Sequence, residues 1–316
     1  MSGVAVGLLV LAALTVGFAL LARRALRLTR AFVRWPGVIV AGLLALVCAA
    51  LTVVGGLGLY RLAGTRVVAL PPASVSVAGQ AGPELVARGA HVAKVACAHC
   101  HSENGDLPMS GGSNMSEETG LPLGDVYGPN LTPGGVLRGL SDEDLFRVIR
   151  TGIGHQRRAT VMAMLGARHL SDEDIRAVIA QLRASPAVEK QKPPFRPTVL
   201  LALFIGAGFL KLETPASVGP VVAPPKAATQ EYGRYVFEYM GCADCHGPKL
   251  DGEVPPPTPP GPDLRDEIRT SSAEAFLKRM RGGPSGSVMP WESTAILDDV
   301  ELEALLLQLK SVAAAR

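Results

Sequence analysis

The sequence predicts an all-α protein in which two membrane-spanning helices precede two small helical modules. Three observations support this architecture. Two apolar runs without a charged residue lie within the first 60 positions. The pattern Cys-x-x-Cys-His occurs twice, beginning at Cys97 and at Cys242. Behind each copy, Ser or Asp residues precede segments whose apolar side chains recur at helical spacing, which is typical of capped amphipathic helices.

The two apolar runs, residues 3–22 and 37–59, predict a membrane anchor over residues 1–62. Each run reaches the roughly 20 residues that a membrane-spanning helix needs. The loop between them carries the basic residues Arg23, Arg24, Arg27, Arg30 and Arg34. By the positive-inside rule this loop is cytoplasmic, so the N-terminus and everything after Tyr60 are expected on the outer side. A cleavable signal peptide fits the first run poorly, because no basic segment precedes it.

Charge and cysteine content exclude several classes of protein. The chain has 31 basic and 28 acidic residues, and this near balance gives no support for a nucleic-acid partner. Four of the five cysteines belong to the two Cys-x-x-Cys-His motifs. The fifth, Cys48, lies in an apolar run and is interpreted as a packed hydrophobic residue. A disulfide framework is therefore not expected.

The Cys-x-x-Cys-His pattern is the attachment sequence of c-type haem. Two thiols on one helical turn reach the two vinyl groups of the porphyrin, and the next imidazole becomes the proximal iron ligand. The predicted attachment residues are Cys97, Cys100, His101, Cys242, Cys245 and His246. A zinc site or a thioredoxin-like pair would not explain a histidine after both cysteine pairs. Two covalently bound haem c groups are therefore expected, and His99 is given no ligand role.

The first module is expected over residues 83–186, after a linker at 63–82 that is rich in Pro, Gly and Ala. A helix beginning at Pro83 runs into the first attachment motif. A Gly- and Ser-rich loop, residues 104–125, then shows no periodicity. Two helices follow, with Ser141 and Ser171 as their N-caps and three acidic residues in each first turn.

A second linker is expected over residues 187–228 and the second module over 229–316. The linker is Pro-rich but contains an apolar run, 198–210, too short to span a membrane. We interpret this run as a short helix that is buried between the modules or lies on the membrane surface. A third span is disfavoured because it would place the second motif in the cytoplasm. In the second module, Ser272 caps one helix and Asp298 starts the last one.

Together these features resemble the small cytochrome c domain family, and the resemblance covers nearly all of both modules. It implies a three-helix core in which the last helix crosses the first. It also implies a methionine as the sixth iron ligand, in the loop before the last helix. Met289, followed by Pro290, occupies that place in the second module, and Met162 occupies it in the first. The alternatives to Met162 are Met164, His155 and His169.

The resemblance further implies that a proline carbonyl anchors each proximal histidine. Pro129 and Pro262 stand in matching Gly-Pro-Asn-Leu and Gly-Pro-Asp-Leu segments, each between an attachment motif and the middle helix. Such an anchor fixes the tautomer and raises the basicity of the imidazole.

The resemblance implies an electron-transfer protein rather than an enzyme, because His/Met ligation fills both axial positions of the iron. We expect a membrane-anchored dihaem cytochrome c on the outer, periplasmic side of the cytoplasmic membrane. Its partners would be the lipid bilayer and redox proteins of a respiratory or photosynthetic chain, with the cytochrome acting as carrier or as subunit of a complex. Similar modules serve as cytochrome subunits of extracytoplasmic dehydrogenases, which is the alternative function. A dihaem peroxidase is the second alternative.

Overall fold

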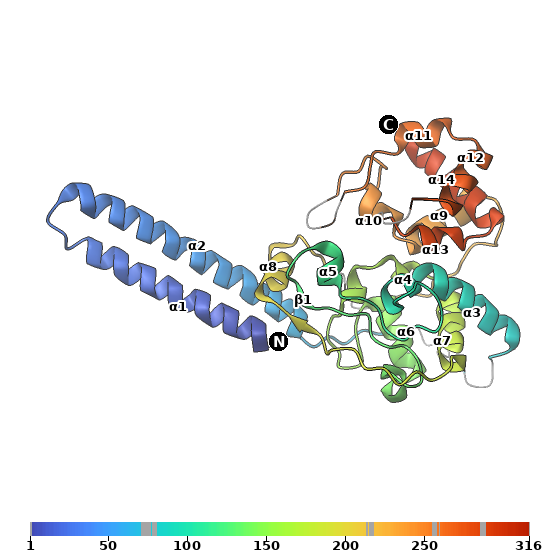
Figure 1. Ribbon diagram of the computed structural model, residues 1–316, viewed down its shortest axis with the longest axis horizontal. Helices are drawn as coiled ribbons and strands as arrows, with labels where there is room; N and C mark the ends of the chain where they lie inside the picture. Colours follow the sequence, from blue (N-terminus) through green and yellow to red (C-terminus); the bar gives the residue numbers. More distant parts are fainter. Residues whose placement is uncertain are drawn as a thin grey trace. The chain divides into compact units, whose positions relative to one another are not determined.

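The computed structural model describes residues 2–70, 77, 81–212, 214, 218–254, 258, 260–284 and 289–315. It is all-α as predicted, apart from one pair of two-residue strands (Figure 1). The predicted linker residues 71–76, 78–80, 213 and 215–217 lie outside the described residues. The chain divides into two compact units. The anchor unit comprises residues 1–64, 115–126 and 194–211, and the module unit comprises 65–114, 127–193 and 212–316.

The two predicted apolar runs form the longest helices of the anchor unit, α1 (Ser2–Ala25) and α2 (Ala31–Ala63). Both are long and apolar enough to cross a membrane. They pack against each other, yet many large apolar side chains point outward, such as Leu9 at 69% and Phe32 at 74% exposure. A helix with an apolar surface on all sides is typical of a lipid environment.

The short apolar run of the second linker forms α8 (Val199–Ala207), which packs on α2 rather than between the modules. Glycines allow the two helices to approach closely. A Cβ on Gly58 would lie 1.7 Å from the carbonyl oxygen of Ala202. The Arg61 guanidinium donates a hydrogen bond to the carbonyl oxygen of Ile205 over 2.6 Å. Close contact through small residues is typical of helix pairs in membranes.

Part of the aperiodic loop that follows the first motif belongs to the anchor unit. It contains α5 (Met115–Thr119) and β1 (Gly124–Asp125), and β1 pairs antiparallel with β2 (Arg196–Pro197). The Thr198 hydroxyl donates to the carbonyl oxygen of Pro122 over 2.7 Å. The loop is therefore held by the chain segment that leads directly into α8.

The first module is built on the crossing of α3 (Pro83–Ala96) and α7 (Asp172–Ala184). The elements between them are α4 (Ala98–His101), η1 (Val136–Gly139), α6 (Asp142–Thr151), η2 (Val161–Met164) and η3 (Gly166–His169). Ser141 and Ser171 cap α6 and α7, as predicted. At the crossing, a Cβ on Gly89 would lie 1.9 Å from the carbonyl oxygen of Ala177. Only glycine permits this approach.

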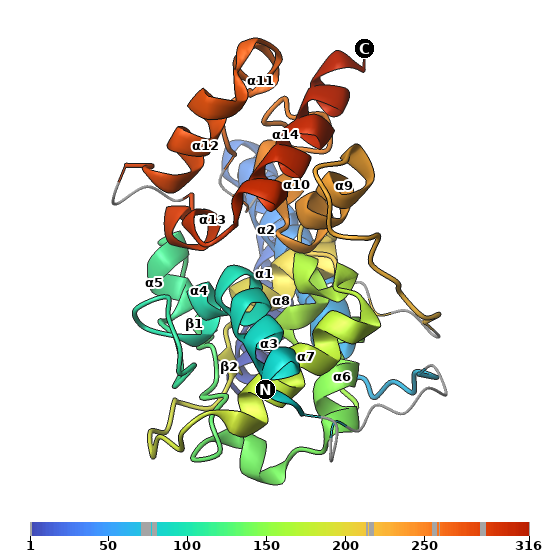
Figure 2. The same cartoon turned by 90° about the vertical axis from the view of Figure 1, so that its right-hand side faces the viewer.

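The second module repeats this plan with α9 (Gln230–Tyr239) and α14 (Asp299–Ala314), which lie against each other in both views (Figures 1 and 2). The elements between them are α10 (Cys242–His246), α11 (Arg265–Thr270), α12 (Ala273–Arg281) and α13 (Trp291–Ala295). A Cβ on Gly233 would lie 1.8 Å from the carbonyl oxygen of Ala304. The predicted capping box of Asp298 and Glu301 opens α14. Each module thus has its own glycine-mediated crossing.

We predict that Gly89→Ala destabilises the first module. The new methyl group would overlap the Ala177 carbonyl, so α3 and α7 would have to separate, at a cost of about 1–3 kcal/mol in the free energy of unfolding. Denaturant unfolding of the detergent-solubilised chain measures this. Gly139→Ala is the control, because a Cβ there would meet no atom within 4 Å. Equal stability of the two variants would contradict the prediction.

Candidate haem sites

The first attachment motif forms a single tight turn at the end of α3. The carbonyl oxygen of Cys97 accepts hydrogen bonds from the backbone N–H groups of Cys100 (3.2 Å) and His101 (3.0 Å). Both cysteines are free thiols in the structure. Burial, together with the neighbouring Cys100, raises the pKa of Cys97 to about 12. The turn therefore presents two cysteine sulfurs and one imidazole within five consecutive residues.

His101 is held in a single tautomer. Its side chain is buried, and its Nδ1–H donates to the carbonyl oxygen of Pro129 over 3.2 Å. Burial lowers the pKa of His101, against the opposing effect of this hydrogen bond. The imidazole is thus neutral, and the lone pair of its Nε2 atom is available for a metal ion.

Two glycines let the Pro129 loop lie directly on the attachment turn. A Cβ on Gly128 would lie 1.7 Å from the carbonyl oxygen of Cys100, and a Cβ on Gly112 would lie 1.9 Å from it. The backbone N–H of Gly112 donates to the carbonyl oxygen of Gly128 over 3.0 Å. The position of the Pro129 carbonyl therefore depends on backbone contact, and any side chain at Gly128 would displace it.

The second attachment motif has the same arrangement in α10. The His246 Nδ1–H donates to the carbonyl oxygen of Pro262 over 3.4 Å. The backbone N–H of Gly261 donates to the carbonyl oxygen of Cys245 over 2.7 Å, and a Cβ on Gly261 would lie 2.6 Å from Nδ1 of His246. Burial and the nearby Asp244 carboxylate raise the pKa of Cys242 to about 12.

The backbone around the two motifs matches beyond the residues that the sequence singled out. In the first module, the N–H of Gly111 donates to the carbonyl oxygen of His101, and in the second the N–H of Gly252 donates to that of His246, both over 2.9 Å. Likewise, the N–H of Leu131 donates to the carbonyl oxygen of Met109, and the N–H of Leu264 donates to that of Leu250, both over 2.8 Å. Gly111 and Gly252 have positive φ values of 109° and 74°. Sequence reasoning missed these two glycines, because different loop lengths separate them from their motifs.

The predicted methionine ligands lie in comparable places. Met162 is in η2, half-buried against the module core, and the adjacent Ala163 is packed against Gly152. Met289 is half-buried against the core directly before Pro290, the N-cap of α13. Both methionines precede the last helix of their module. The residue after each methionine, Ala163 or Pro290, is fixed by packing or by its place at a helix start.

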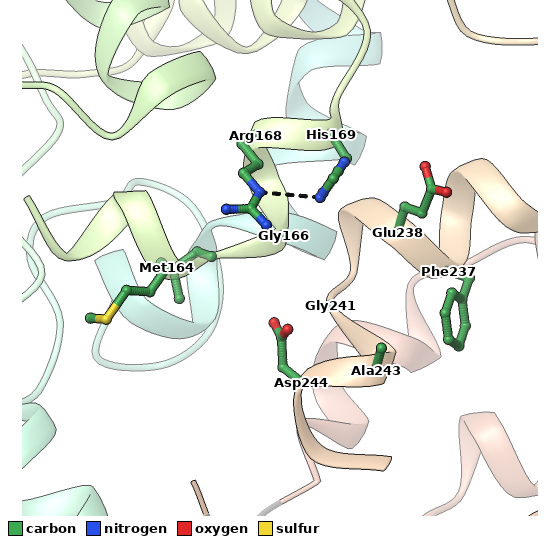
Figure 3. Close-up of a pocket in the computed structure, with 10 residues that line it drawn as sticks. Met164, Gly166, Arg168, His169, Phe237, Glu238, Gly241, Ala243 and Asp244 are labelled. Carbon is green, nitrogen blue, oxygen red and sulfur yellow. Dashed lines mark hydrogen bonds between the residues drawn. The ribbon is translucent and has the colours of Figure 1, made fainter. Parts of the chain in front are cut away.

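The alternative ligands have different surroundings, although Met164 lies in η2 together with Met162. Met164 and His169 line a cavity of about 200 Å³ together with residues of α9 and α10 (Figure 3). The Arg168 Nε–H donates to Nε2 of His169 over 3.2 Å. His155 and His99 are exposed.

The donor set fits a c-type haem. Each motif supplies two adjacent thiols and an imidazole whose second nitrogen is already engaged, as a proximal ligand requires. Within the described ranges, no three His, Cys, Asp or Glu side chains converge as they would around a metal ion.

Comparison with known proteins agrees with this geometry. Residues 84–181 match the family model for cytochrome c oxidase, cbb3-type, subunit III. The chain is 29% identical over 182 residues to the gluconate 2-dehydrogenase cytochrome c subunit of Pantoea cypripedii. This alignment covers 54% of the chain and 40% of that relative, so the chain matches less than half of the relative's length.

We predict that Gly128→Ala lowers the haem content of the first module, or raises the reduction potential of the haem that stays bound there, because an imidazole without its anchor is less basic. The methyl group would overlap the Cys100 carbonyl and move the Pro129 carbonyl away from His101, and loss of such an anchor weakens metal ligation roughly 10–100-fold. Haem absorbance per polypeptide and a redox titration measure the effect. Gly105→Asn is the control, since Gly105 has φ of 70° and open space around it. Unchanged content and potentials would refute the prediction.

Proposed function

We propose that this chain is a membrane-anchored dihaem cytochrome c that transfers electrons, and its similarity to cytochrome c proteins supports this proposal. In this proposal one haem c is held by Cys97, Cys100 and His101, and a second by the equivalent residues of α10, Cys242, Cys245 and His246. The groups would supply reversible one-electron transfer. The observation that carries the proposal is the repeated framework, in which each histidine donates to a proline carbonyl behind a closely packed glycine.

Met162 and Met289 are the proposed sixth ligands. Their half-buried positions before the last helix of each module support this assignment. A thioether ligand raises the potential of a haem and leaves no open position at the iron. Both consequences favour electron transfer over chemistry on a substrate. A peroxidase would instead need an open or labile position, and turnover of peroxide by the half-reduced protein would favour that alternative.

The proposed location is the outer, periplasmic side of the cytoplasmic membrane. The arginine-rich turn between α1 and α2 supports a cytoplasmic loop, which would leave both ends of this helix pair outside. Two packed apolar helices, with α8 against them, support an anchor that stays in the membrane. The proposed partners are the lipid bilayer and the redox proteins that donate and accept electrons.

A second candidate is the cytochrome subunit of an extracytoplasmic dehydrogenase. The relative from Pantoea cypripedii, named as the cytochrome c subunit of gluconate 2-dehydrogenase, favours this assignment. In that role the modules would receive electrons from a catalytic subunit bound to them. Mass spectrometry of proteins that copurify with the gently solubilised chain distinguishes a subunit of a complex from a free carrier.

We predict two haem c groups per chain. Haem quantified by absorbance against polypeptide mass should give this ratio, and a Cys242→Ala, Cys245→Ala variant should retain half, because both thioether links of the second module would be lost. Cys48→Ala is the control and should retain both groups, since Cys48 is buried in α2. One haem in the unmodified chain would overturn the dihaem proposal.

We also predict that Met289→Ala removes the near-infrared charge-transfer band that methionine gives to one ferric haem, while the other haem keeps its band. Loss of the thioether should also lower the potential of the affected haem. Met240→Ala, which changes a half-buried methionine of the same module, should leave the band intact. An unchanged band in the Met289 variant would show that another residue is the ligand.

A further inference from the structure

The two modules contact each other through two acid pairs of the same kind. Nε2 of His91, on α3 of the first module, lies 2.9 Å from each carboxylate oxygen of Glu301, on α14 of the second. In the other direction, the hydroxyl of Tyr235 on α9 donates to the Asp174 carboxylate on α7. Each module thus uses its first helix to reach the last helix of the other.

The two donors occupy equivalent positions. His91 lies two residues after Gly89, the glycine at the α3–α7 crossing, and Tyr235 lies two residues after Gly233, the glycine at the α9–α14 crossing. Each glycine faces an alanine, Ala177 or Ala304, that lies six residues after the N-cap of the last helix, so the two side chains leave their helices from equivalent positions.

The two acceptors are equivalent as well. Asp174 lies three residues after the N-cap Ser171, and Glu301 lies three residues after the N-cap Asp298. The backbone N–H of each acid donates to the side chain of its N-cap residue, so both carboxylates are held over the first turn of their helix. In each contact, a first-helix residue of one module binds a last-helix residue of the other, and the positions used are equivalent. Such a reciprocal pair of contacts defines a pseudo-twofold interface, as in an isologous dimer.

A second exchange supports this symmetry. The segment between the candidate methionine and the last helix is η3 in the first module and α13 in the second. η3 contacts α9, and α13 contacts α3. A Cβ on Gly166 of η3 would lie 2.8 Å from the backbone nitrogen of Gly241, the N-cap of the attachment turn α10 (Figure 3). Each methionine loop therefore faces the first helix of the other module.

The acceptor residues of both pairs are buried, which makes the contact specific. Asp174 is 3% exposed and Glu301 is 2% exposed. Asp174 also receives the Arg88 Nε–H over 2.6 Å, and Lys226 Nζ lies 3.3 Å from Glu301. A buried carboxylate that loses a partner is costly, so orientations that break these contacts are strongly disfavoured.

We propose that the His91–Glu301 and Tyr235–Asp174 contacts position the two modules as one pseudo-twofold pair, with a fixed separation between their attachment turns. The inference rests on the proposed dihaem function, which it deepens by identifying residues that hold the two redox centres in place. These four are positioning residues, because none of them belongs to an attachment motif or is a proposed iron ligand. Electron exchange inside the pair then depends on their contacts.

The test combines Tyr235→Phe with Glu301→Gln in the full chain. Phe keeps the ring packing, and Gln keeps the capping box with Asp298, so the changes remove the cross-contacts while leaving each module intact. Glu303→Gln, an exposed acid on the same helix, is the control. His91→Leu with Tyr235→Phe removes the donors of both contacts, leaves each carboxylate its remaining partners, and serves as the second double variant.

Two readouts are expected to change together. Calorimetry of the solubilised protein should show one transition for the module unit in the unmodified chain and in the control, and two transitions in either double variant. Electron exchange between the two haems after photoreduction by one electron should slow by roughly tenfold or more, since displacement of about 1 Å has effects of that order on positioned reacting groups.

A double variant that keeps a single transition and an unchanged exchange rate would overturn the positioning role. A chain that carries one haem would instead overturn the proposed dihaem function. In that case the calorimetric result alone still decides whether the modules are paired, so the two failures are distinguishable.

Discussion

Backbone contact between the first and last helix of each module is the constraint on which the rest of the structure depends. At Gly89 and at Gly233 the facing helix lies so close that a side chain would overlap a carbonyl oxygen. This contact fixes how α3 and α9 lie on the last helices, and each attachment turn begins shortly after the end of α3 or α9. It also determines which side chains of the first helix emerge from the crossing, and these include the residues that reach the neighbouring module.

A second constraint is the loop that contains Pro129 in the first module and Pro262 in the second, because it packs on the attachment turn. In both modules this loop brings a proline carbonyl to the histidine, and a glycine at the point of contact makes room for it. The histidine is thereby oriented to act as a ligand, and burial lowers the pKa of His101. Burial also raises the pKa of Cys97 and of Cys242, which disfavours the thiolate form of each.

The local features of the structure could be predicted from the sequence, whereas the contacts between distant segments could not. Ser171 and Asp298 identify helix starts because a cap acts within one turn. The attachment motif is equally local. By contrast, nothing near His91 indicates that Glu301, 210 residues away, is its partner. Likewise, the two-residue strand β1 has no recognisable pattern, since its partner β2 comes from the second linker.

The loop inserted into the first module has a consequence for how firmly the modules are retained. The chain passes between the anchor unit and the module unit after residues 64, 114, 126, 193 and 211. Proteolysis between residues 65 and 82 would break the direct covalent link to α2, but residues 115–126 and α8 would still be packed in the anchor unit. Release of the modules from the anchor unit would therefore require several cuts, so a single cut would not separate them.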